Sequence, residues 1–166
     1  LVSDVASQLK VNAAEVPTRV AKLRQDLKAA EKELSRLQQK ASAAKAGEAA
    51  QGAKEVAGIK LLVERADAID PKNLRDYADK LRDQLGSGIV VLGRAVGDKK
   101  CTLLVALTKD LKGKVHAGQL AGKLAEAVGG RGGGKPDFAQ AGGADPAKLD
   151  AALAMAEELV AAQVSA

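Results

Sequence analysis

Apolar residues recur at alternating intervals of four and three along the amino-terminal part of the chain. The repeat runs through Val16, Val20, Leu23, Leu27, Ala30, Leu34, Leu37, Ala41 and Ala44. Such a heptad pattern predicts a coiled-coil helix. Asn12 and Glu15 have the spacing of a capping box at its start. We therefore expect residues 1–53 to form a helical arm, and its seam to be Val20, Leu23, Leu27, Leu34 and Leu37.

The partner of this seam stays open at the level of sequence. Alanine at several seam positions gives a weak zipper, so the stripe suits another part of the parent chain and a second copy about equally. Gly47, Gly52 and Gly58 then interrupt the helical pattern and predict a hinge or a short connecting helix. The sequence thus places a domain boundary near residue 54.

Residues 54–166 alternate between short aliphatic runs and amphipathic segments. The runs at 59–63, 88–93 and 101–107 predict strands, the last two joined as a hairpin through residues 96–99. Asp70-Pro71 and Asp145-Pro146 predict helix starts, and a further helix is expected over 116–128. The fold class is therefore α+β, with helices packed on a small sheet.

Composition narrows the chemistry. Tyr77 and Phe138 are the only aromatic residues, so the core is aliphatic. Cys101 and His116 are the only residues of their types, which excludes disulfides and Cys/His zinc clusters within the chain. Cys101 in a strand is most simply a small buried hydrophobe. No Walker motif, dinucleotide fingerprint or carboxylate pair stands out, so we expect no catalytic residue and no metal site.

The chain has no apolar run of bilayer-spanning length and no signal-peptide pattern at its start. We expect a cytoplasmic protein without a membrane partner. The first residue is Leu1 rather than methionine, and helix-like sequence begins at once. The sequence therefore reads as a piece of a longer polypeptide.

Positive charge is concentrated in one segment. The formal net charge is +5, and residues 94–135 hold nine basic against three acidic side chains. An ordinary solvated face would intersperse its signs, so this concentration favours an anionic partner.

Seven glycines lie among the fifteen residues 129–143, and we expect this stretch to be a loop. Glycine lets a ligand approach main-chain N–H groups closely, and Arg131 and Lys135 flank them. A plain flexible linker would not explain why Pro136, Asp137 and Phe138 stand among the glycines. The loop therefore favours phosphate or sugar oxygens as ligands.

The stretch Gly-Gly-Arg-Gly-Gly-Gly-Lys-Pro-Asp-Phe-Ala-Gln-Ala-Gly-Gly at 129–143 resembles a signature of the carboxy-terminal (C-Ala) domain of bacterial alanyl-tRNA synthetases. The resemblance extends along the chain, including residues 70–75, 108–111 and 117–120. It implies a helical arm followed by a globular domain akin to the one associated with DHH-type phosphoesterases.

The resemblance also implies a function. In that family the synthetase attaches alanine to tRNA and removes wrong amino acids in upstream domains that use ATP, Mg and Zn, whereas this part contacts the outer corner of the tRNA and needs no cofactor. Lys135 stands where the phosphoesterases place a histidine, so binding carries over and catalysis does not. The implied tRNA-binding residues are Lys112, Lys114, Arg131, Gly132, Gly133, Gly134, Lys135 and Gln140.

Two readings of function remain. In the first, the chain binds tRNA(Ala) on behalf of the upstream aminoacylation and editing domains. In the second, it is a dimerisation module, in which the heptad seam joins two synthetases. A general nucleic-acid surface that also takes DNA is a further alternative to the first.

Overall fold

The computed structural model describes residues 2–165, so the outermost residues of the two predicted domains lie outside it. Contacts divide the chain into two compact units, residues 1–41 and 42–166. The first unit contains helix α1 (Val2–Leu9), the short 3-10 helix η1 (Ala13–Glu15) and most of helix α2 (Val16–Gln51). The backbone N–H of Asn12 donates to the Glu15 carboxylate at 3.1 Å, as the predicted capping box requires. The long helix of the predicted arm is therefore confirmed.

The heptad stripe of α2 is open. Val20, Leu23, Leu27, Leu34 and Leu37 are between 39% and 60% exposed. Five large apolar side chains on one helix stripe are more than the scattered apolar residues of an ordinary surface.

The last turns of α2 belong to the second unit. The helix continues through Gly47 to Gln51, where the sequence predicted a hinge. Ala46 is fully buried, and Ala49 and Ala50 pack against the same apolar cluster. Burial of this alanine face offsets the cost of about 1 kcal/mol for one glycine within a helix. The division by contacts consequently falls before residue 42, whereas the sequence places the boundary at 53/54.

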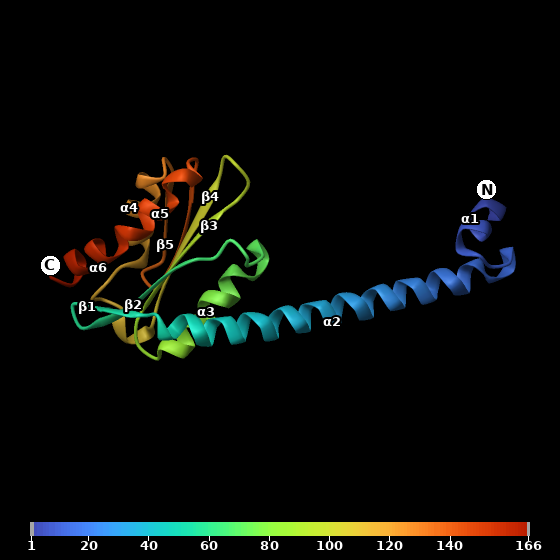
Figure 1. Ribbon diagram of the computed structural model, residues 1–166, viewed down its shortest axis with the longest axis horizontal. Coiled ribbons are helices and arrows are strands. Elements are labelled where there is room, and N and C mark those ends of the chain that lie inside the picture. Colours follow the sequence, from blue (N-terminus) through green and yellow to red (C-terminus); the bar gives the residue numbers. More distant parts are fainter. Residues whose placement is uncertain (1, 166) are drawn as a thin grey trace. The chain divides into compact units, whose positions relative to one another are not determined.

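A six-stranded sheet forms the centre of the second unit (Figure 1). Its strands are β1 (Lys54–Val56), β2 (Ile59–Arg65), β3 (Ile89–Ala95), β4 (Cys101–Leu107), β5 (Arg131–Gly134) and β6 (Phe138–Gly143). Their order is β1-β2-β3-β4-β6-β5, with β2 and β3 parallel and every other pair antiparallel.

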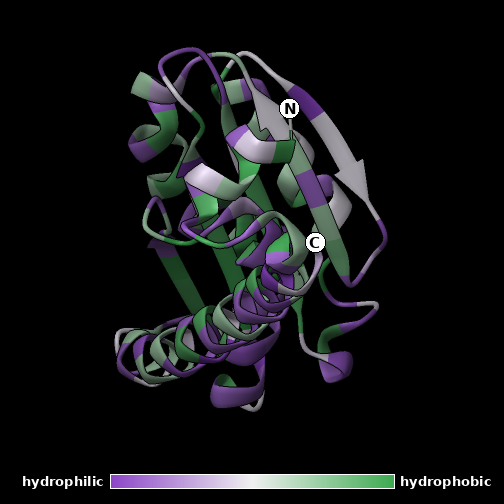
Figure 2. Ribbon diagram, turned by 90° about the vertical axis from the view of Figure 1, so that its right-hand side faces the viewer, coloured by the Kyte–Doolittle hydropathy of each residue, from purple (hydrophilic) through white to green (hydrophobic). Residues whose placement is uncertain are grey.

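Helices cover both faces of this sheet. Helix α3 (Leu74–Leu85), entered through η2 (Pro71–Asn73), lies on one face beside the end of α2. On the other face lie α4 (Ala117–Ala127), α5 (Leu149–Ala154) and α6 (Ala156–Val164), with η3 (Lys109–Leu111) and η4 (Pro146–Lys148) as connections. Strands β3 and β4 are buried on both faces and are the green strands at the centre of Figure 2. The predicted α+β class is confirmed.

Most predicted elements are found where expected. The aspartates of both Asp-Pro pairs accept a backbone N–H two residues on, and Gly86 ends α3 with a φ of 71°. Strand β1 was not predicted. It turns into β2 through Ala57 and Gly58, whose φ values of 50° and 78° suit a two-residue hairpin.

The glycine-rich stretch is not the predicted loop. Residues 131–143 form the β5–β6 hairpin, and β6 pairs with β4 from Ala106↔Phe138 to Cys101↔Gly143. The neighbouring strand imposes this pairing, which the side chains of a glycine run cannot signal.

None of the helices within residues 2–165 combines the length and the apolar character that crossing a membrane requires.

Candidate nucleic-acid interface

Strand β5 forms one edge of the sheet, and its only neighbouring strand is β6. All four of its residues, Arg131–Gly134, are exposed. In an antiparallel edge strand, alternate residues direct their N–H and C=O groups away from the partner strand. Residues Arg131 and Lys135 flank the three glycines, which make β5 a pale ribbon in Figure 2. The edge therefore combines accessible backbone groups with a basic side chain at each end.

Packing explains two of the three glycines. A Cβ at Gly132 would lie 2.2 Å from the Ala141 Cβ, and one at Gly134 would lie 2.6 Å from the Ala139 Cα. Only glycine allows β5 to approach β6 this closely. Gly133 is different, because the one atom within 4 Å of a Cβ there is the Gly118 carbonyl oxygen at 3.9 Å. Gly133 is thus the glycine that packing within the chain leaves unexplained.

The turn between β5 and β6 holds one group of predicted site residues. Lys112 Nζ pairs with the Asp137 carboxylate at 2.8 Å. The Lys112 hydrogen bond is the largest cause that lowers the pKa of Asp137, and the nearby charge of Lys135 contributes. The Leu107 N–H donates to the Asp137 carbonyl oxygen at 2.9 Å, which fixes the turn beside the end of β4.

Lys114 lies in the segment that follows η3. Its charge helps to lower the pKa of Asp110, after the larger effect of the hydrogen bond from Ser87. Lys112 and Lys114 are both exposed and lie two residues apart, so the η3 segment and the β5–β6 turn present basic groups at one end of the sheet.

Arg131 lies at the opposite end of β5. It pairs in register with Gly142, which pairs in turn with Thr102 of β4. Lys99 and Lys100, in the β3–β4 hairpin, immediately precede β4 at this end. Exposed Gln140 lies between the two ends, opposite Gly133. Of the predicted residues, Lys112, Lys114 and Lys135 therefore lie at one end of β5 and Arg131 at the other, with the three glycines and Gln140 between them.

Both aromatic side chains have interaction partners within the fold. The Arg75 guanidinium lies over the Phe138 ring, 4.7 Å from its centroid. The Tyr77 hydroxyl donates to the Glu64 carboxylate at 2.8 Å. Burial, followed by the Glu64 hydrogen bond, raises the pKa of Tyr77 well above its usual range.

His116 and Cys101 have structural positions. The His116 Nδ1 atom accepts the Gln119 N–H at 3.3 Å and so caps helix α4. Cys101 is buried, and burial is the largest cause that raises the pKa of its thiol.

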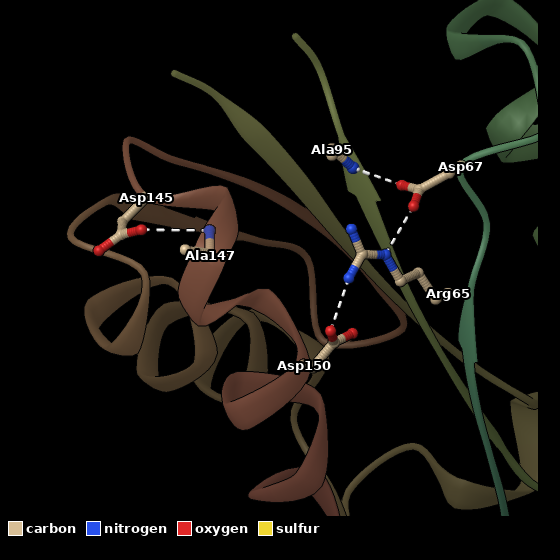
Figure 3. Close-up of polar contacts among 6 residues, drawn as sticks. All are labelled: Arg65, Asp67, Ala95, Asp145, Ala147 and Asp150. Atoms are coloured by element: carbon tan, nitrogen blue, oxygen red, sulfur yellow. Dashed lines mark hydrogen bonds and ion pairs between the residues drawn. The ribbon is translucent and has the colours of Figure 1, made fainter. Parts of the chain in front are cut away.

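A charged cluster that the sequence analysis missed lies where β2 and β3 end (Figure 3). Arg65 bridges Asp67 and Asp150, with both contacts at 2.6 Å. The other Asp67 oxygen accepts the Ala95 N–H at 2.7 Å. Burial alone would raise the pKa of Asp67, but these hydrogen bonds together with the charges of Arg65 and Arg94 outweigh it and the pKa is lowered.

Arg94 lies beside this cluster and acts on Asp67 through its charge, without a hydrogen bond. Its Nε and Nη1 atoms are buried and have no hydrogen-bond partner, and within residues 2–165 no other buried side-chain nitrogen or oxygen shares this state. The sequence signal for Arg94 was only its place in the basic segment 94–135.

Comparison with known proteins identifies the globular unit. Residues 58–162 match the DHHA1 domain family. The chain is 44% identical over 162 residues to the alanine–tRNA ligase of Cupriavidus necator, covering 98% of this chain and 18% of the relative. It is also 44% identical over 164 residues to the alanine–tRNA ligase of Thiobacillus denitrificans, covering 99% of this chain and 19% of that protein. The chain thus spans about a fifth of the length of these relatives.

A solved structure agrees with these matches. The crystal structure of the C-Ala domain from Aquifex aeolicus alanyl-tRNA synthetase has a TM-score of 0.60 and 28% sequence identity, covering 66% of this chain and 97% of that one. The chain therefore belongs to the DHHA1 domain family, and its relatives in that family are alanine–tRNA ligases and their C-Ala domain.

Proposed function

We propose that this chain is the tRNA-binding C-Ala module of an alanyl-tRNA synthetase and that it contacts the outer corner of the tRNA. The observation that carries the proposal is strand β5, an exposed glycine edge between Arg131 and Lys135 in a domain whose relatives are alanine–tRNA ligases. The chain itself performs no catalysis, has no cofactor and acts in the cytoplasm. ATP, Mg and Zn belong to the upstream domains.

Backbone recognition suits this surface better than base reading. Lysine and arginine neutralise phosphates without reading sequence, and exposed N–H groups donate hydrogen bonds to phosphate and ribose oxygens. Stacking on unpaired bases requires free aromatic faces, but Arg75 covers Phe138 and Tyr77 is buried. The module therefore recognises the shape of the tRNA. Tethering this contact to two catalytic domains raises their effective concentration on the same tRNA.

The test is a salt titration of tRNA binding. The double variant Arg131→Ala/Lys135→Ala should bind tRNA(Ala) roughly thirtyfold more weakly, because each lost contact to a phosphate removes a charge-assisted hydrogen bond. Each loss should also reduce the slope of log affinity against log salt by about 0.7 to 0.9. Lys60→Ala/Lys72→Ala removes the same charge from exposed sites elsewhere and should bind like the parent. Unchanged binding by the first pair would refute the role of β5, and equal binding of duplex DNA would favour a general nucleic-acid surface.

The open stripe on α2 favours dimerisation as a second function. Leu27 and Leu34, both more than half exposed, lie one heptad apart in the predicted seam. Leu27→Lys/Leu34→Lys places charge in that seam and should shift a dimer to monomers, since the seam positions must be apolar. The melting of residues 42–166 should not change. Sedimentation velocity measures the first effect and circular dichroism the second. A parent chain that sediments as a monomer at all concentrations would rule out this function.

A further inference from the structure

One part of the sheet face that carries α3 is uncovered. Helix α3 and the end of α2 cover β2, β3 and β4, where Leu92 and Leu104 are buried. On the adjoining β6–β5 wing, Gln140 and Gly142 are exposed. Among the described residues, no helix therefore covers the α3-side face of β6 and β5 at Gln140 and Gly142. We call this open surface the shelf.

A row of paired residues crosses the end of this shelf. Arg94 pairs with Thr102, Thr102 with Gly142, and Gly142 with Arg131. Residues paired directly across neighbouring strands point to the same face of a sheet. Three strand spacings of about 4.8 Å place the backbones of Arg94 and Arg131 roughly 14 Å apart. Two arginines thus bound a row whose middle residues are small.

Arg94 is the unusual member of the row. The cost of burying a charged donor without a partner is about 1–3 kcal/mol or more, so such groups are rare in folded proteins. Asp67 accepts from Arg65 and from the Ala95 N–H, and the charge of Arg94 helps to lower the pKa of Asp67, but no hydrogen bond joins Arg94 to it. The planar guanidinium is the side chain best matched to the oxygens of a phosphate.

A shallow hollow of about 430 Å³ adjoins the row. Lys99, Lys100, Thr102 and Gly142 are among the residues that line it. A Cβ at Gly142 would have only the Cys101 carbonyl oxygen within 4 Å, at 3.9 Å. The hollow thus shares Thr102 and Gly142 with the row, it is open at Gly142, and Lys99 and Lys100 line it.

We propose that this row, from Arg94 through Thr102 and Gly142 to Arg131, is a phosphate-binding shelf that holds the RNA backbone. The proposal rests on the proposed tRNA-binding function and adds a second contact, at the end of the sheet opposite Lys112 and Lys135. An incoming phosphate would draw the half-buried Arg94 guanidinium outward, so that its Nε and Nη1 donors gain oxygen partners, while Lys99 and Lys100 add positive charge beside it.

The decisive variant is Arg94→Met in the complete chain, measured by fluorescence anisotropy with labelled tRNA(Ala). The affinity should fall roughly tenfold, with a salt slope lower by about 0.7 to 0.9, because one phosphate contact is lost. The melting temperature should change little, since Nε and Nη1 have no hydrogen bond to lose and only the charge attraction to Asp67 is removed. A residue that only supports the fold would give the reverse pattern, a lower melting temperature with retained affinity.

Gly142→Val tests the shelf without changing charge. The position has room for a Cβ, and valine suits a strand, so the variant should fold while its side chain obstructs the floor. Affinity should again fall, with the salt slope nearly unchanged. Lys60→Ala is the charge-matched control for Arg94→Met, since Lys60 is exposed near the opposite end of its strand. If Arg94→Met lowers the melting temperature, its loss of affinity is no longer specific, and the affinity of Gly142→Val for tRNA decides whether the shelf binds RNA.

The outcomes separate this proposal from the function on which it rests. A parent chain that does not bind tRNA would overturn both. If the parent binds but Arg94→Met and Gly142→Val bind equally well, the shelf is wrong and the β5 interface stands. Competition by poly-glutamate as effective as that by tRNA would also overturn the shelf, because the surface would then select acidic chains in general.

Discussion

Gly130→Ala is expected to lower the free energy of unfolding by about 3 kcal/mol, the upper end of the cost of overpacking. Its Cβ would lie 1.9 Å from the Gly142 carbonyl oxygen and 2.6 Å from the Gly143 Cα. Both atoms belong to the backbone of β6, so no side-chain rotation relieves the clash. The two strands would have to separate at the point where β5 begins. Urea denaturation followed by circular dichroism measures the loss.

Gly133→Ala is the matched control, because it adds the same methyl group three residues further along. The nearest atom to its Cβ is 3.9 Å away, which is ordinary van der Waals contact. We expect a change within about 0.5 kcal/mol. Equal destabilisation by the two variants would mean that Gly133, like Gly132 and Gly134, has no room for a side chain, and the argument that Gly133 is free for a ligand would then fail.

The sequence predicted those elements whose signals are local. Aliphatic runs such as residues 101–107 specify buried strands, and an aspartate before a proline specifies the start of a helix. Both signals act within a few residues. They therefore hold in the folded chain, whatever lies next to each element.

The hairpin β5–β6 could not be predicted from local signals of this kind. A run of glycines has no alternation of apolar and polar side chains, so its strand character depends on the pairing of β6 with β4. Strand β1 was not predicted because its turn lacks the usual sequence signal. Ala57, rather than asparagine or glycine, takes the positive φ at the first turn position.

The candidate site was predictable in composition but not in arrangement. The cluster of positive charge pointed to the basic residues, whereas their separation into two groups follows from the position of β6 between β4 and β5. Lys112 and Lys135 meet Asp137 at one end, and Arg131 lies at the other. Arg94 is distinctive only because no hydrogen-bond acceptor reaches its buried nitrogens, a property that spacing along the chain does not encode.

The domain boundary gives a second large expected effect. A fragment of residues 54–166 should melt roughly 10 °C below a fragment of residues 42–166, with a loss of roughly 3 kcal/mol in stability. The shorter fragment lacks buried Ala46 and also Ala49, Ala50 and Ala53, which pack against the α3-side cluster. Each alanine methyl, with the surface it covers, contributes roughly 0.8 kcal/mol.

The shorter fragment also loses polar contacts from the same helical turns. Lys45 Nζ lies 3.4 Å from the Glu64 carboxylate, and Lys80 Nζ donates to the Ser42 hydroxyl at 2.8 Å. These partly exposed polar contacts add less than the four alanines, so the apolar loss dominates the difference. Calorimetry of the two fragments under the same conditions decides the boundary. Melting temperatures within about 2 °C of each other, equivalent to less than 1 kcal/mol, would place it at residues 53/54 and leave the end of α2 as part of the arm.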